Sequence, residues 1–304
     1  MKTRRALLAL GVILAFLVLT VQAAETATHP FVGVTHVART ETEPRPLSMH
    51  VVMVDLKAPG LRFLLTPHAG PKDTLKETTL QFLTRHKAQA AVNVHFFAPW
   101  PAPDPDPGVA DLLGLAASEG RIYSPFDTRL STTTLFSGRG VGLNIDAHNR
   151  AGIVHRKNGD RTGRLVAEPV KLHNAMSGNK QILTQGKNTA GTSEWDETLN
   201  PRTVIGLAPK DNLVLFLVDG RQPGVSEGMT LREMADLLRR DYGVTDALNL
   251  DGGGSATLCL ADPTPRVANV PVGIGNIPGS QRPVGSNLAI FAALSQPPAL
   301  PRSP

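Results

Sequence analysis

The sequence predicts an α+β fold with a mixed β-sheet core and a few helices. Short runs rich in Val, Leu and Ile recur at strand length, whereas only two segments repeat apolar side chains at helical spacing. The chain has no internal repeat that would indicate a solenoid. Its 304 residues are enough for one large domain or two modest ones, with a sizeable buried core.

An export signal is expected over residues 1–23. Three basic residues near the N-terminus precede an apolar run at 6–21, which ends in a small-residue cleavage pattern at Ala23. The run is shorter than the roughly 20 apolar residues of a spanning helix, so cleavage is expected rather than an uncleaved anchor. We therefore expect a periplasmic or secreted protein without stable membrane insertion after cleavage.

Charge and cysteine content narrow the function classes. The formal net charge is +5, and three of the 31 basic side chains lie in the signal, so a nucleic-acid partner gets no support. Cys259 is the only cysteine, which excludes an intramolecular disulfide. It lies in an apolar run, where a buried, inert thiol is expected rather than a nucleophile.

The predicted strands and helices follow from local patterns. A first helix is expected at 74–87 behind Asp73 as N-cap. A second begins with the capping box of Thr230 and Glu233 and ends at Gly243. The predicted strands lie at 48–56, 61–66, 90–94, 202–207, 213–218 and 247–250.

The second helix lies between two strands that are each followed by an aspartate. Asp219 follows the strand at 213–218, and Asp251 follows the strand at 247–250. If these strands run parallel, a right-handed crossover brings their C-terminal ends to one edge of the sheet. Asp219 and Asp251 would then face one crevice.

Proline-rich segments set the expected domain limits. We expect one domain at 31–295 and a disordered proline-rich tail at 296–304. The loop at 99–107 is stiff and proline-rich. Its acids, Asp104 and Asp106, are expected to be solvated rather than bound to calcium.

The most informative motif is Asn-Leu-Asp-Gly-Gly-Gly-Ser at 249–255. Three glycines after a strand allow close backbone approach, and their successive amide groups can form an anion-binding concavity. A flexible hairpin turn is the alternative of about equal weight. The substrate-binding candidates in this motif are Gly252, Gly253, Gly254 and Ser255.

Arginines are the expected partners of a phosphodiester anion. A guanidinium can donate two hydrogen bonds to one phosphate group, and the candidates are Arg202, Arg221 and Arg282. Each alone is more often a solvated surface arginine. Arg202 opens a predicted strand and Arg221 follows a predicted strand end, which favours a functional position.

Breaking a glycosidic bond needs carboxyl groups as acid, base or nucleophile. Asp219 and Asp251 are the candidates, although a turn role is the more common reading of either one alone. Glu227 is a third carboxylate nearby and ranks lower. A phosphate leaves more readily than an alcohol, so an acid matters less.

The sequence contains no motif typical of zinc enzymes or of serine hydrolases. The nine histidines show no zinc-binding spacing, and Ser255 lacks the Gly-x-Ser-x-Gly elbow of serine hydrolases. No metal or cofactor is expected.

Residues 200–258 carry an ordered series of motifs: Pro-Arg-Thr at a strand, Val-Asp-Gly at a strand end, Met-Thr-Leu at a helix, and Asn-Leu-Asp-Gly-Gly-Gly-Ser. In this series the chain resembles the phosphodiester glycosidase family. Asn-x-x-Phe-Phe at 93–97 and Arg282-Pro283 extend the resemblance over nearly the whole mature chain. His95 departs from the small residue common in the family.

The resemblance implies a single domain of that family's type with an active site that includes Asn93, Arg202, Thr203, Asp219, Asp251 and the glycines. Asn93 joins the two aspartates as a catalytic candidate, and Phe97 joins the substrate-binding candidates. It also implies hydrolysis of the bond between a sugar's anomeric carbon and a phosphodiester, on envelope or extracellular glycans. The alternatives are a metal-dependent phosphodiesterase that uses Asp219 and Asp251, and a non-catalytic binder of envelope polysaccharide.

Overall fold

The computed structural model describes residues 23–99, 108–126 and 140–295. The predicted export signal, the acids of the proline-rich loop and the C-terminal tail therefore lie outside the described residues. Over these three described ranges, no helix has both the length and the apolar character needed to cross a membrane.

The largest sheet has eight strands, and each strand is antiparallel to its neighbour. In spatial order these are β1 (Ala24–Phe31), β2 (Val34–Glu41), β3 (Leu47–Asp55), β17 (Asn212–Val218), β16 (Arg202–Ala208), β18 (Asp246–Asn249), β14 (Lys180–Thr184) and β15 (Lys187–Asn188).

Within the described ranges, three smaller antiparallel sheets accompany it. One contains β20 (Pro265–Val267), β19 (Leu258–Ala261), β6 (Ala90–Asn93), β21 (Asn287–Phe291) and β4 (Arg62–Leu65). Another contains β10 (Arg121–Ser124), β9 (Ala116–Ser118), β13 (Asn174–Ser177), β11 (Val141–Ile145) and β12 (Ala151–His155). The smallest contains β5 (Thr74–Leu75), β8 (Val109–Leu112) and β7 (Phe97–Ala98).

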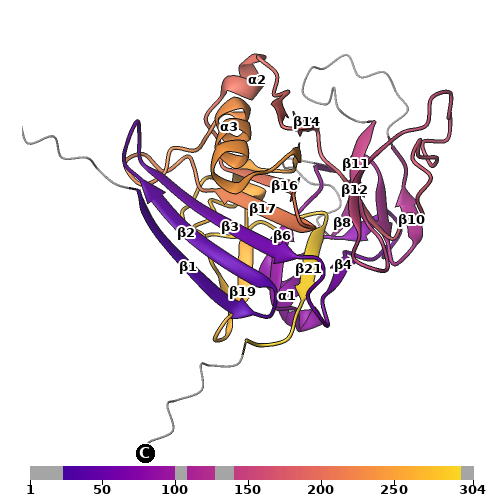
Figure 1. Ribbon diagram of the computed structural model, residues 1–304, viewed down its shortest axis with the longest axis horizontal. Helices are drawn as coiled ribbons and strands as arrows, with labels where there is room; N and C mark the ends of the chain where they lie inside the picture. The colour runs from indigo at the N-terminus through magenta and orange to yellow at the C-terminus, as the bar shows by residue number, and fades with distance from the viewer. Residues whose placement is uncertain (1–22, 100–107, 127–139, 296–304) are drawn as a thin grey trace, which may run out of the picture.

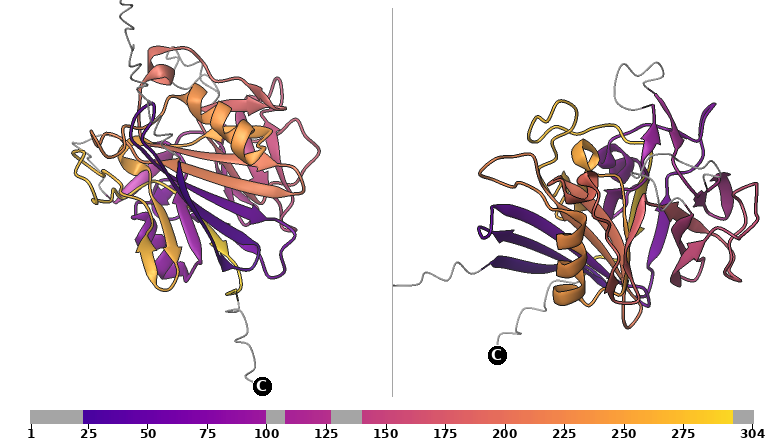
Figure 2. Two further views of the ribbon diagram at one scale, coloured as in Figure 1. Left: turned by 60° about the vertical axis from the view of Figure 1, so that its left-hand side comes forward. Right: turned by 90° about the horizontal axis from the view of Figure 1, so that it is seen from above.

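The core lies between the eight-stranded sheet and the sheet that contains β6. Side chains of β17 alternate: Leu215 and Leu217 face this core, whereas Val214 and Phe216 face helix α3 (Leu231–Tyr242) on the outer side. Figure 1 shows α3, in orange, lying across β16 and β17, and the turned views of Figure 2 show it on one face of the large sheet. Helix α1 (Thr79–His86) covers the far side of the second sheet. Two helices thus flank two sheets, and the predicted α+β class is confirmed.

Helix α3 is the element that the sequence predicts best. Thr230 and Glu233 form the expected capping box, and Gly243 ends the helix in the left-handed conformation at φ 64°. Leu231, Met234 and the other apolar residues of its inner face are buried against the sheet. The capping signals in the sequence therefore predict the correct limits of this helix.

The first predicted helix begins too early. Residues Thr74 and Leu75 form β5 and pair with β8, and α1 starts only after Thr78, whose side chain forms a capping box with Gln81. Asp73 is not the N-cap, because its carboxylate accepts the amide hydrogen of Leu112. Sheet pairing overrides the local helical pattern of residues 74–77.

The six predicted strands are confirmed within one residue at each end as β3, β4, β6, β16, β17 and β18. Strands β17 and β18 are both antiparallel to β16, which lies between them, so they run parallel to each other. Their C-terminal ends reach the same edge of the sheet, as predicted.

Cys259 is buried, and burial raises the pKa of its thiol to about 12.

Candidate active site

A cavity of about 370 Å³ lies where β18 ends. Its wall contains three arginines, three large aromatic side chains and the glycine triplet. Among the lining residues in the described ranges, Asp251 is the one carboxylate. A larger hollow of about 620 Å³ lies beside β11 and β12 and contains none of the sequence-predicted site residues. The smaller cavity is therefore the candidate site, and its lining residues are Phe96, Phe97, Ala98, Leu113, Trp195, Asn200, Arg202, Arg221, Asp251, Gly252, Gly253, Gly254 and Arg282.

Asp251 is held at the cavity through its own backbone. Its amide donates to the carbonyl of Val94 at 2.9 Å, and its carbonyl accepts from Nδ2 of Asn93 at 2.6 Å. Burial raises the pKa of the Asp251 carboxyl to about 6, although a hydrogen bond from Ser255 and the charges of Arg282 and Arg221 favour the ionised form. Asp251 can therefore exchange a proton near neutral pH.

The glycine triplet packs closely against two other segments, at residues 201–202 and at Gly273. Gly253 has a φ of +59°, which a side chain rarely adopts. At Gly254 a Cβ atom would lie 1.8 Å from the carbonyl oxygen of Gly273. Any larger residue at Gly254 would push this loop away from the residue 270–280 segment.

Three amides at this turn do not contribute to the predicted anion-binding concavity. The amide of Gly253 donates to the carbonyl of Pro201 at 2.8 Å, and those of Ser255 and Ala256 donate to carbonyls within the turn. These donors are therefore directed at protein acceptors rather than at a ligand. Positive charge near this turn comes from arginine side chains instead.

Arg202 lines the cavity but is mostly engaged with the protein. Its side chain is 2% exposed, and its Nε donates to the carbonyl of Met229 at 3.3 Å. Its Nη2 donates to the carbonyls of Trp195 and Thr198 at 3.1 and 2.8 Å, and its guanidinium stacks on the Trp195 ring at 4.3 Å. Nε and Nη2 are therefore occupied by backbone carbonyls, which leaves Nη1 for the predicted contact with a phosphate. Burial lowers the pKa of Arg202 to about 10, so it stays charged at neutral pH.

Arg221 and Arg282 are the other two arginines of the cavity lining. Arg221 is exposed, and its guanidinium donates to the side-chain oxygens of Asn200 and Asn276 at 2.8–3.1 Å. Arg282 is 9% exposed and donates to Ser255 Oγ at 3.2 Å and to the carbonyl of Gly273 at 3.1 Å. The charges of both arginines act on Asp251, and the hydrogen-bond acceptors named here are neutral.

Two predicted site residues support the cavity from behind. Asn93 is buried, and its Oδ1 accepts from Thr203 Oγ1 at 3.0 Å and from the amide of Thr257 at 3.1 Å. Thr203 is also buried, and neither side chain is part of the cavity lining. Their contacts hold β6, β16 and the Asp251 loop together. Phe97, by contrast, lines the cavity as predicted.

Asp219 and Glu227 do not join the cavity. The Asp219 carboxylate accepts hydrogen bonds from Asn269 Nδ2 at 2.8 Å and from the amide of Val270 at 3.1 Å. Burial raises its pKa despite these bonds. Neither Asp219 nor Glu227 lines the cavity, so the expected crevice with two facing aspartates is not formed.

His95 is part of the core rather than of the cavity lining. It is fully buried, its Nδ1 lies 2.7 Å from Ser286 Oγ, and its Nε2 lies 3.0 Å from the carbonyl of Leu115. Burial lowers its pKa to about 4, so it is neutral at physiological pH.

Sequence reasoning missed Trp195, Asn200 and, as a lining residue, Phe96. Trp195 belongs to the one-turn helix α2 (Glu194–Glu197) in a polar stretch without hydrophobic periodicity. The capping box of Ser193 and Asp196 is the signal that could have located this helix. In the described ranges no group of three or more His, Cys, Asp or Glu side chains is placed to hold a metal ion.

Comparisons with known proteins place these residues in a family. The human N-acetylglucosamine-1-phosphodiester alpha-N-acetylglucosaminidase is 44% identical over 75 residues, which is 24% of this chain and 14% of the human protein. The alignment thus leaves most of the human protein unmatched.

Solved structures share the fold. The catalytic domain of the zebrafish N-acetylglucosamine-1-phosphodiester alpha-N-acetylglucosaminidase superposes with a TM-score of 0.60 at 21% identity, over 90% of this chain and 89% of that one. A candidate exported protein of Burkholderia pseudomallei gives 0.54 at 17% identity, over 81% and 74% of the two chains. The family model of the phosphodiester glycosidases matches residues 86–291, most of the chain. This protein therefore belongs to the phosphodiester glycosidase family.

Proposed function

We propose that this protein hydrolyses the bond between the anomeric carbon of a sugar and a phosphodiester. The observation that carries the proposal is one carboxyl with a pKa of about 6 in a cavity that also contains three arginines. A phosphodiester is a singly charged anion, and guanidinium groups bind phosphate oxygens well. Family membership supports the same reaction.

In this mechanism the arginines bind the phosphate and Asp251 acts on the water. A water oxygen attacks the anomeric carbon, the bond from that carbon to the phosphate oxygen breaks, and the phosphate leaves as a monoester. Ionised Asp251 accepts the proton of the attacking water. Arg221, Arg282 and Nη1 of Arg202 stabilise the charge that develops on the leaving phosphate, so no acid is needed on that side.

The sugar would contact the aromatic part of the cavity. Phe96 and Trp195 lie with their ring centroids 6.4 Å apart at 59°, and Phe97 lies next to Phe96 in the chain. Such apolar faces suit the C–H faces of a sugar ring, while Asn200 offers a polar contact.

The substrate is proposed to be a phosphate-linked glycan of the cell envelope or outside the cell. The expected export signal supports this location, and so does the fold shared with a candidate exported protein. Within the family, the human relative's name specifies N-acetylglucosamine 1-phosphodiesters, which makes that sugar the first to test.

A product screen tests the proposal. The purified protein would be incubated with N-acetylglucosamine and glucose 1-phosphodiesters in oxygen-18 water, with mass spectrometry of both products. We expect the label in the sugar, because the anomeric carbon–oxygen bond breaks. Label in the phosphate would contradict the proposal and identify a phosphodiesterase, and saturable binding without turnover would identify a polysaccharide binder.

Chelation tests the metal question separately. Activity should survive dialysis against EDTA, because arginines neutralise the substrate's single charge. Loss of activity that a divalent ion restores would favour the metal-dependent phosphodiesterase.

A further inference from the structure

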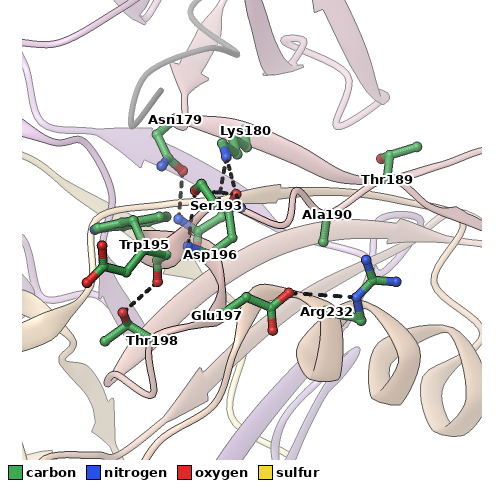
Figure 3. A network of polar contacts seen from close by, with 12 residues as sticks. Asn179, Lys180, Thr189, Ala190, Ser193, Trp195, Asp196, Glu197, Thr198 and Arg232 are labelled. Carbon is green, nitrogen blue, oxygen red and sulfur yellow. Dashed lines mark hydrogen bonds and ion pairs between the residues drawn. The ribbon is translucent and has the colours of Figure 1, made fainter. Parts of the chain in front are cut away.

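The two walls of the cavity are connected by a buried polar network whose central residues, Asn179, Lys180 and Asp196, lie outside the site motifs. One wall is the Asp251 loop after β18, and the other is α2 with Trp195 and its partner Arg202. Between them lie Asn179 and Lys180, at the start of β14 (Figure 3).

Asn179 binds the strand that leads to Asp251. Its amide donates to the carbonyl of Asn249 at 3.1 Å, and Nδ2 of Asn249 donates back to Asn179 Oδ1 at 2.7 Å. Asn249 is the last residue of β18, two positions before Asp251. Gly178 packs closely here, since a Cβ atom would lie 2.1 Å from the Asn249 carbonyl oxygen.

Lys180 binds α2 through an ion pair. Its Nζ donates to both carboxylate oxygens of Asp196 at 2.6 Å, and the two side chains are 11% and 1% exposed. Asp196 also accepts from the amide of Ser193 at 3.0 Å and from Ser193 Oγ at 2.6 Å. Burial opposes the charge on Asp196, but the bonds from Lys180 and Ser193 outweigh it and lower its pKa.

Helix α2 in turn determines where Arg202 and Trp195 lie. The carbonyls of Trp195 and Thr198, on either side of Asp196 in the chain, accept both hydrogen bonds of Arg202 Nη2. A one-turn helix has too few internal bonds to hold itself in one position. The Lys180–Asp196 pair therefore fixes the wall that Trp195 and Arg202 form.

We propose that Lys180 and Asp196 are positioning residues that hold Trp195 and Arg202 opposite Asp251. Removing the pair should loosen the substrate-binding wall, while Asp251 keeps its own contacts with Asn93 and Val94. The main effect should therefore be weaker binding rather than slower chemistry. This inference rests on the proposed function, because it concerns the same cavity.

The test compares Lys180→Met, Asp196→Asn and the double variant with Glu197→Gln. Glu197 is the next residue on α2, and its exposed contact with Arg232 spans 4.0 Å, so it is a matched control. Each single variant leaves one buried partner without its counterpart, whereas the double variant removes both charges of the pair and should fold better than either. All are assayed well below their melting temperatures.

With a sugar 1-phosphodiester as substrate, we expect the double variant to raise KM about tenfold and to change kcat less than about threefold. Glu197→Gln should leave both within about twofold. A fall in Tm with unchanged KM would overturn the proposal, because a purely structural role reduces the folded fraction and leaves KM intact. A large fall in kcat at constant KM would also overturn it.

A fluorescence measurement that needs no substrate separates this proposal from the proposed function. In a Trp100→Phe background, Trp195 is the only tryptophan, and acrylamide quenching of its fluorescence reports its exposure. Quenching should increase in the double variant but not in Glu197→Gln. That result would stand even if wild-type protein turned over no phosphodiester, whereas equal quenching in all variants would overturn the positioning role.

Discussion

Two aspartates of this chain have the same position in the topology but different surroundings. Asp251 and Asp219 each follow one of two parallel-running strands at the same edge of the large sheet, and each precedes a glycine. Asp251 lines the cavity among arginines, whereas Asp219 is 2% exposed and bonded to Asn269 and Val270. Strand topology thus brings two carboxylates to one edge, and the following loop decides which one can meet a substrate.

The two aspartates also differ in the charged groups that surround them. Burial raises the pKa of both carboxyls, but the groups that oppose burial at Asp219 are neutral side chains and a backbone amide. At Asp251 they include Arg282 and Arg221. A carboxylate beside two arginines can release and accept a proton while a phosphate binds, whereas Asp219 is suited to fixing the residue 269–270 segment.

The largest expected effect is that of Asp251→Asn. An amide cannot accept the proton of the attacking water, so kcat should fall at least about a hundredfold. Kinetics on a sugar 1-phosphodiester at pH 7.5 would measure this. Activity near that of wild type would remove Asp251 from the mechanism.

Thermal melts distinguish this loss from misfolding. Burial in the folded protein raises the pKa of Asp251. The protonated carboxyl therefore contributes its full stabilisation below about pH 4, and this contribution is lost as the group ionises through about pH 6. The asparagine variant has no ionised carboxylate at this position. Its Tm should therefore equal or exceed that of wild type at pH 7.5.

The wild-type pH profile should show the next largest effect. If ionised Asp251 accepts a proton, then kcat/KM should fall about tenfold per pH unit below about pH 6 and stay level above it. Rates between pH 4.5 and 8 would show this limb. The opposite profile, with activity rising as Asp251 is protonated, would make it the general acid and leave the base unassigned.

Asp219→Asn should affect stability more than catalysis. An amide in place of the carboxylate would direct its own N–H groups at a donor of Asn269 or Val270, which costs about 1–3 kcal/mol. Tm falls roughly 2–4 °C for each kcal/mol in domains of 150–250 residues. At temperatures where the variant is folded, kcat should stay within about fivefold of wild type. A loss as large as that of Asp251→Asn would restore Asp219 to the active site.

The sequence predicts the scaffold of the site better than its contacts. Apolar alternation and the Thr230 capping box locate β16, β17, α3 and β18 closely, because these signals are local. The position of Asp251 at a cavity follows from the strand that precedes it. These predictions needed no knowledge of distant contacts.

The remaining contacts depend on segments far away in the chain. Asp219 turns toward Asn269, which lies in a loop 50 residues later. Arg202 bonds to the carbonyls of α2, so its contacts depend on where this one-turn helix lies. The helix predicted at residue 74 likewise begins late because β5 pairs with β8. Local patterns do not encode such pairings.

The smallest expected effect sharpens the contrast in charge between the two aspartates. Arg221 is exposed, so Arg221→Gln should leave the fold intact, and its charge favours ionised Asp251. Removing it should raise the pKa of Asp251 and move the acidic limb of the kcat/KM profile to higher pH by roughly a few tenths of a unit.

The matched control is Arg150→Gln, which removes an exposed arginine paired with Asp146 at the turn between β11 and β12, outside this cavity. The control should not move the limb, and 0.5 M salt should shift the wild-type limb in the same direction as Arg221→Gln, since salt screens exposed charges. A limb that stays in place in Arg221→Gln, or moves to lower pH, would show that the group titrating near pH 6 is not the carboxylate beside Arg221.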